Sequence, residues 1–249
     1  MPPIELANSL DDVRRMLTRC IQTAREENSA DGYFALIYAW ETADIARAAD
    51  DGLFLEPDEI RRMIVAFANR YFTARAQFRA GAPTSRAWSL AFRAARASSA
   101  LVVQHILLAM NAHINLDLAA ATAETGLPWP DYSKVDVILG NGVGRIQGCL
   151  NRTTPVLRVV DKVGRGFDEM FTIYSVKAAR RYAYEMAQRL RNTPEAGRPA
   201  LVAEADACAL KYGELLLSPP LRDRVLLGAI HLTEVNASPR EFLDLLERP

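Results

Sequence analysis

Apolar residues recur at intervals of three and four along most of this chain, which is the spacing typical of amphipathic helices. The stretch from Ser9 to Glu27 is a clear example, because its apolar residues form a single stripe on a helix. Further helices with apolar positions at helical spacing are predicted over residues 33–49, 57–78, 84–98, 100–124, 167–191, 200–217, 220–235 and 238–247. About nine helices result, so the pattern predicts an all-α fold.

Local signals for helix ends support these boundaries. Ser9-Leu-Asp-Asp12 has the form of a capping box, Pro57 suits a first helical turn, and Thr84 is expected to cap the helix that follows it. Ser238-Pro239 combines a cap with a first-turn proline in the same way. The connections are short and no linker or internal repeat divides the chain, so residues 1–249 are expected to form one all-α domain, a bundle around a buried central helix at about 100–124.

The composition is that of a globular protein and does not point to a particular partner. The chain has 249 residues, of which 50% are hydrophobic and 24% charged, as in ordinary globular proteins. Its 30 basic residues balance its 30 acidic ones, so no overall field favours nucleic acid or an anionic membrane. Three widely separated cysteines argue against a disulfide framework, and the N-terminus lacks the pattern of a secretory signal. A cytoplasmic location is therefore expected.

One segment competes with the all-α prediction. Residues 135–144 resemble a strand that runs into a glycine-rich phosphate loop. A dinucleotide fingerprint requires a third glycine three residues after the second, and that place is taken by Arg145 in one register and by Gln147 in the other. A bend or a close helix contact is the better interpretation of these glycines.

The segment 100–124 carries the most informative side chains. It is long enough to span a bilayer, but the polar and ionisable side chains in its middle would make a membrane span very costly. We therefore expect a buried central helix, whose polar groups must all have partners. On a regular helix Gln104, Asn111 and Asn115 lie on one stripe, and we expect these amides to hold neighbouring elements together.

A second, broader stripe on this helix holds His105, His113 and Asp117. His113 and Asp117 are one turn apart, close enough for a direct contact or for shared ligation of a metal ion. Three interpretations remain open: a structural hydrogen bond, a metal site, and an acid–base pair in which Asp117 orients His113. His105 lies about 12 Å from His113 along the axis, so it belongs to a different part of the cavity, where it could act as a second acid or base.

A metal site would need more ligands than the central helix supplies. His113 and Asp117 would bind one divalent ion, such as zinc or iron, together with residues from other helices. His231 lies on another apolar segment and is a candidate third ligand, although for His231 alone a core position is favoured. The other candidate ligands are Asp44, Asp131, Asp136 and Glu185.

Several segments together resemble an uncharacterised, largely bacterial family that is described only as a domain of unknown function. The central sequence Gln104-His-Ile-Leu-Leu-Ala-Met-Asn-Ala-His-Ile-Asn-Leu-Asp-Leu118 is similar to the family's signature. Phe67–Ala74, Trp88–Phe92 and Arg181–Ala187 are similar to its flanking segments, so the resemblance covers most of the chain from about Tyr38 to Leu190. It implies a single all-α domain and supplies no reaction.

The function predicted from the sequence is that of a helical enzyme acting on a small, partly apolar molecule through His105, His113 and Asp117. A metal ion would make it a hydrolase or an oxygenase, and a metal-free acid–base pair would suit an isomerase or a cyclase. A non-catalytic ligand-binding or interaction protein is the alternative from another class. Aromatic residues that could contribute cavity walls, although core positions are commoner for them, are Tyr38, Trp40, Tyr71, Phe72 and Trp88.

Overall fold

The computed structural model describes residues 3–97, 100–135, 137–139, 145, 148, 176–219 and 237–247. The regular structure in these ranges is helical and contains no strand, which confirms the all-α prediction. The elements are α1 (Leu10–Glu26), α2 (Asp31–Asp50), α3 (Pro57–Arg79), α4 (Arg86–Arg96), α5 (Val102–Ala112), a π-helical segment η1 (His113–Leu118), α6 (Ala119–Thr125), α10 (Val176–Asn192), a 3₁₀ turn η2 (Glu195–Gly197), α11 (Arg198–Leu217) and α13 (Pro239–Glu247).

The predicted helix ends are mostly where the sequence placed them. Ser9 caps α1 by accepting a hydrogen bond from the backbone N–H of Asp12, and Pro57 is the first residue of α3. The cap of α4 was predicted one residue too early, since Ser85 and not Thr84 accepts the bond from the N–H of Trp88. The predicted helix 220–235, with His231, and the glycines 140–144 lie outside the described residues, while residues 137–139 are helical.

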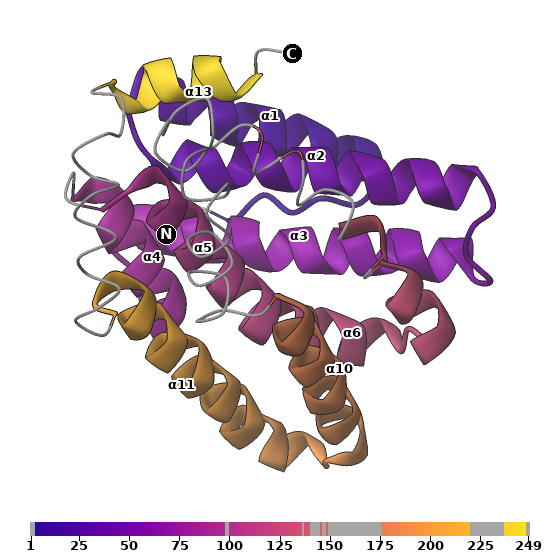
Figure 1. Ribbon diagram of the computed structural model, residues 1–249. Coiled ribbons are helices and arrows are strands. Elements are labelled where there is room, and N and C mark those ends of the chain that lie inside the picture. Colours follow the sequence, from indigo (N-terminus) through magenta and orange to yellow (C-terminus); the bar gives the residue numbers. More distant parts are fainter. Residues whose placement is uncertain are drawn as a thin grey trace, which may run out of the picture.

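A long central helix formed by α5, η1 and α6 is surrounded by the other helices. Figure 1 shows α1 and α2 side by side with α3 below them, while α10 and α11 form a pair at the opposite side. The central helix contacts α2, α3, α4, α10 and α11. It is also long and apolar enough to cross a membrane by length and composition, but 83% of its most apolar window is buried inside the fold. The other helices therefore cover it, as the sequence predicts for a core helix.

The amide stripe of the central helix holds α11 in place. Gln104 donates to the backbone oxygen of Leu216 at 2.8 Å, and Asn111 donates to that of Ala209 at 2.6 Å. The Asn111 oxygen in turn accepts a hydrogen bond from Asn115. These contacts confirm the structural role predicted for the amides, because they satisfy buried polar groups at a helix contact.

Asp131 anchors the loop between α2 and α3. Its carboxylate is fully buried and accepts the backbone N–H groups of Leu55 and Glu56 at 2.9 and 2.8 Å. Burial raises the pKa of Asp131, but those two hydrogen bonds and the bond from Lys134 outweigh burial and lower the pKa overall. Asp131 was predicted as a candidate metal ligand, and the structure instead places it as an acceptor for this loop.

Asp131→Asn is expected to destabilise the fold by about 1–3 kcal/mol, since an amide offers one acceptor oxygen to two N–H donors that now bind separate oxygens of the buried carboxylate. Chemical denaturation beside Asp58→Asn, an exposed carboxylate on α3, measures the difference. Equal stability of the two variants would show that Asp131 does not hold the loop.

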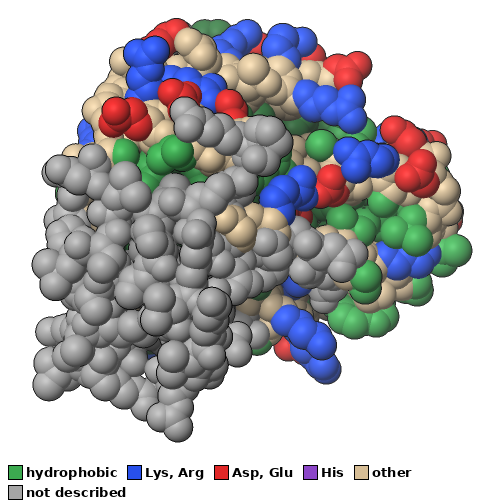
Figure 2. Space-filling view, turned by 45° about the horizontal axis from the view of Figure 1, so that its top comes forward, with side chains coloured by type: hydrophobic (Ala, Val, Ile, Leu, Met, Phe, Trp, Pro, Cys, Tyr) green, Lys and Arg blue, Asp and Glu red, His purple; other side chains and the backbone are tan. Residues whose placement is uncertain are grey.

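The outer surface carries both charge signs in close alternation. Figure 2 shows Lys and Arg side chains interspersed with Asp and Glu over the described part of one face. Many of them form pairs, such as Arg61 with Asp50 at 2.8 Å and Arg189 with Glu204 at 2.8 Å. In the part of the chain that the structure describes, basic and acidic side chains are therefore mixed and often paired, rather than separated into patches of one sign.

Candidate functional site

His113 and Asp117 meet inside the π-helical turn of the central helix. The turn spans His113–Leu118 and interrupts an otherwise α-helical run. Single π turns of this kind occur often at functional sites. His113 Nδ1 lies 2.9 Å from Asp117 Oδ2, and the two residues are only 2% and 6% exposed. The direct contact that their spacing allows is therefore present.

Trp88 completes this arrangement from α4. Its indole Nε1 donates to Asp117 Oδ2 at 2.8 Å, so one carboxylate oxygen accepts from both Trp88 and His113. A carboxylate only accepts, so His113 must carry its proton on Nδ1 to complete this bond. Neutral His113 then has its lone pair on Nε2, which is the form required of a base.

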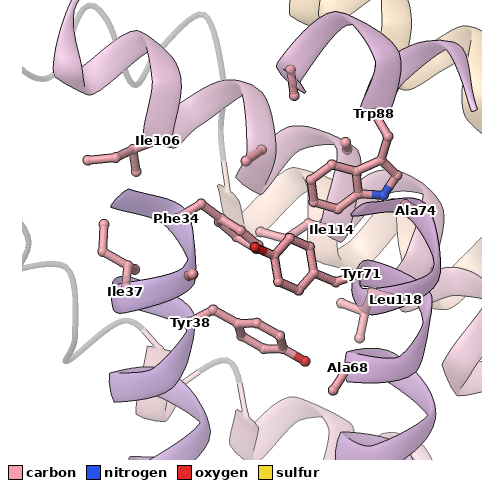
Figure 3. Packing of buried hydrophobic residues seen from close by; sticks show 14 of the residues in the cluster. Phe34, Ile37, Tyr38, Ala68, Tyr71, Ala74, Trp88, Ile106, Ile114 and Leu118 are labelled. Carbon is pink, nitrogen blue, oxygen red and sulfur yellow. The ribbon is translucent and has the colours of Figure 1, made fainter. Parts of the chain in front are cut away.

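Aromatic rings enclose the imidazole of His113. Phe67 of α3 stacks on it with a centroid separation of 3.5 Å and an interplanar angle of 7°, and Tyr38 of α2 meets it edge-on at 4.6 Å. In Figure 3 the side chains of Phe34, Tyr38 and Tyr71 extend into the space between α2 and α3. These rings exclude water from the imidazole and restrict its orientation.

His113 also lines a partly open cavity of about 90 Å³ between α2, α3, the central helix and α10. A single water needs about 10–15 Å³ on the same measure, so the space suits several waters or a small organic molecule. Most of the described lining is apolar or aromatic: Phe34, Ile37, Ile45, Met63, Ile64, Phe67, Met110, Ile114, Leu118, Tyr132, Val135, Leu139 and Val176. The polar lining comes from Tyr38, Glu41, Thr42, His113 and Arg180.

The free nitrogen of His113 is the most reactive feature of this cavity. Nε2 is buried and has no hydrogen-bond partner among the described residues. Burial lowers the pKa of His113, and the hydrogen bond and charge of Asp117 oppose that effect only in part. The imidazole is therefore neutral at physiological pH, with a lone pair available to a bound molecule.

Glu41 is a second ionisable group in the same cavity. Both of its carboxylate oxygens are buried and lack a hydrogen-bond partner in the described part of the chain. Burial raises its pKa to about 7, with Asp44 adding to the effect while Arg145 and Arg180 reduce it. Glu41 therefore exchanges its proton near neutral pH.

The structure separates His105 from this site. His105 is buried beside Tyr33, at a centroid distance of 6.1 Å, and it is not among the described residues that line the cavity. Burial lowers its pKa to about 4. His105 is therefore separate from His113, as expected, but the structure does not place it in another part of the same cavity as the sequence analysis did, and it gives no support to a shared catalytic role.

The other candidate ligands are dispersed. Asp44 pairs with Arg47 and Arg145, and Glu185 pairs with Arg181 on the exposed side of α10. The described residues contain no group of three His, Cys, Asp or Glu side chains that could hold a metal ion. His231 and Asp136 lie outside the described residues, so their prediction as ligands stays a prediction.

Sequence reasoning missed most of the cavity wall. Of the five aromatic residues proposed for it, only Tyr38 lines the cavity, whereas Tyr71 and Trp88 pack near His113 and Phe72 belongs to the core. Glu41 was also missed, although it has a sequence signal. It stands four residues from both Ile37 and Ile45, which places a carboxylate on the buried face of α2.

These features define an all-α protein with a buried His–Asp pair that faces a largely apolar cavity. The chain belongs to a family of unknown function, DUF5995, whose family model matches residues 10–219. No curated protein and no solved structure matches it. The family membership confirms the resemblance found in the sequence, and the chemistry has to be argued from the site itself.

Proposed function

We propose that this chain is an enzyme in which His113 acts as a general base on a small, largely apolar substrate. One observation carries the proposal: Asp117 holds His113 by Nδ1, and this leaves a buried Nε2, unpartnered among the described residues, beside the cavity. Trp88 fixes Asp117 in turn. A base that is oriented by a carboxylate and shielded from water is the arrangement that general-base catalysis requires.

The reaction class follows from what these residues can do. His113 takes a proton from a C–H or O–H group of the substrate at Nε2, and Asp117 stabilises the imidazolium that forms. The same imidazolium then returns the proton to another atom. Such proton relocation suits an isomerisation, an elimination or a cyclisation, and it can proceed in a cavity with mostly apolar walls.

A metal-dependent enzyme is the second candidate. Histidines that bind a metal through one nitrogen commonly donate the other N–H to a carboxylate, as His113 does to Asp117. In this arrangement Asp117 would orient His113 without touching the metal, and further ligands would have to come from outside the described residues. A stoichiometric divalent ion bound by the wild type and lost from His113→Ala would favour this candidate over the first.

A base-sensitive probe tests the leading proposal. In 5-nitrobenzisoxazole, removal of the C3 proton forms a nitrile, breaks the N–O bond and releases a coloured phenolate, so the rate reports a base in an apolar site. We expect the wild type to open this ring at least about tenfold faster than His113→Ala, because a positioned base contributes on the order of 10²–10⁴ to its own reaction.

His105→Ala is the matched control, since it removes a buried histidine that does not line the cavity. It should retain the wild-type rate, and circular dichroism should show that each variant is folded. A wild-type rate equal to that of His113→Ala would contradict the proposal. A His113→Ala protein that loses stability alone, with its rate unchanged, would favour a purely structural His–Asp pair.

A further inference from the structure

One face of α2 brings three oxygen-bearing side chains into the cavity. Tyr38, Glu41 and Thr42 stand at positions i, i+3 and i+4 of the helix, and all three line the cavity. Tyr38 touches His113, and Glu41 and Thr42 follow about one turn, or about 5 Å, further along the helix axis. The cavity is thus lined by a base from the central helix and by a polar group on α2, formed by Glu41 and Thr42, which we call its polar end.

The polar end offers hydrogen-bonding atoms that no described residue satisfies, so they are available to a ligand. Both oxygens of Glu41 are buried without a hydrogen-bond partner in the described ranges. A buried polar group left in that state costs on the order of 1–3 kcal/mol, and a carboxylate costs more. A molecule that supplies a hydrogen bond here would recover this free energy when it binds.

The charges around Glu41 limit what that molecule carries. Arg180 of α10 lines the cavity, Asp44 lies one turn away on α2, and Arg145 pairs with Asp44. An ammonium group on the ligand would be repelled by the positive charge of Arg180. A carboxylate group would be repelled by the negative charge of ionised Glu41. A hydroxyl group avoids both repulsions, and it can donate to the ionised form of Glu41 or accept from the protonated form.

We propose that the substrate is a small, largely apolar molecule that carries a hydroxyl group, which Glu41 and Thr42 hold at the polar end of the cavity. This inference rests on the proposed function for its choice of cavity, and it adds the class of substrate. Glu41 and Thr42 are then binding residues that decide which end of the molecule reaches His113.

Three ligands with the same six-carbon chain separate the possible head groups. 1-Hexanol, hexylammonium and hexanoate are titrated into the full-length protein at pH 7, and binding is measured by calorimetry. We expect 1-hexanol to bind at least about tenfold more tightly than either charged ligand. Glu41→Leu and Thr42→Val should each weaken 1-hexanol at least about fivefold, because each removes an oxygen from the polar end.

Two further variants keep the test independent of folding. Glu41→Gln retains a donor and an acceptor, so it should bind 1-hexanol within about threefold of the wild type. Asp44→Asn, on the same helix but outside the described lining, should not change binding. Tighter binding of hexylammonium or of hexanoate, absence of 1-hexanol binding, or unchanged 1-hexanol binding by Glu41→Leu would each overturn the inference.

The outcome is separable from that of the ring-opening assay. Binding of 1-hexanol needs no proton transfer, so it can follow the expected pattern even if His113 proves not to be a base. Conversely, ring opening that depends on His113 combined with a failed hexanol series would leave the proposed function standing and would reject only the hydroxyl-bearing substrate class.

Discussion

Asp117→Ala is expected to destabilise the protein by about 3–5 kcal/mol, the largest effect of any single substitution at the site. One oxygen of Asp117 accepts from both Trp88 and His113 in a nearly water-free interior. Removing it leaves two buried donors without a partner as well as a cavity, and losses of this size are typical when one partner of a buried polar pair is deleted.

Urea denaturation of Asp117→Ala and two control variants, each compared with the wild type, measures this effect. Asp117→Asn keeps the one acceptor oxygen that both donors use and should lose only about 1–2 kcal/mol, since a neutral amide oxygen accepts more weakly than a carboxylate. Glu124→Ala removes an exposed carboxylate that pairs with Arg70 and should change stability by less than about 1 kcal/mol. If Asp117→Ala were as stable as Glu124→Ala, the hydrogen bonds around Asp117 would not organise the interior.

A fall in pH is expected to change the folding stability in opposite directions through two buried groups, His105 and Glu41. Burial lowers the pKa of His105 from 6.5 to about 4. A lowered pKa means that the unfolded chain takes up the proton first, so the stability linked to His105 is complete above pH 6.5 and is lost as pH falls towards 4. The shift corresponds to about 3 kcal/mol.

Glu41 shows the reverse dependence. Burial raises its pKa from 4.5 to about 7, so the folded protein takes up the proton first. The stability linked to Glu41 is complete below pH 4.5 and is lost as pH rises through 7, again by about 3 kcal/mol. Between pH 4.5 and 6.5 the two contributions therefore nearly cancel in the wild type.

Single substitutions should expose each contribution. The stability of His105→Leu relative to the wild type is expected to increase by about 2–3 kcal/mol as pH falls from 7 to 4.5, whereas that of Glu41→Gln should decrease by a similar amount. Denaturation curves at four pH values across this range give both differences. Parallel pH profiles for the wild type and both variants would show that neither group titrates as its burial requires.

The central helix shows how far the sequence could predict the site. A His and an Asp four residues apart in an apolar segment were enough to place the two side chains within reach of each other, because helical spacing is local and regular. The spacing left a direct contact and shared metal ligation equally open. The structural role of the amide stripe was predicted from the same regular spacing, but its partner helix α11 was not. The π turn at His113–Leu118 was not predicted, since the sequence was placed on an ideal α-helix throughout.

The cavity wall depended on information that local spacing does not carry. Phe67 stacks on His113 from α3, and this contact depends on how two distant helices pack. Some aromatic residues that the sequence suggested for the wall, such as Phe72, proved to be core positions instead. Glu41 could have been found, because its four-residue spacing from Ile37 and Ile45 marks it as buried, but its place in the same cavity as His113 follows only from the tertiary arrangement.

The protonation state of His113 tests the central claim most directly. Nitrogen-15 NMR of the histidine side chains, with His113 assigned by comparison with His113→Gln, reports which ring nitrogen carries the proton between pH 7 and 8. We predict a neutral ring with the proton on Nδ1 and a bare Nε2 throughout this range. A proton on Nε2, or a doubly protonated ring at pH 7, would contradict the assignment of His113 as a base oriented by Asp117.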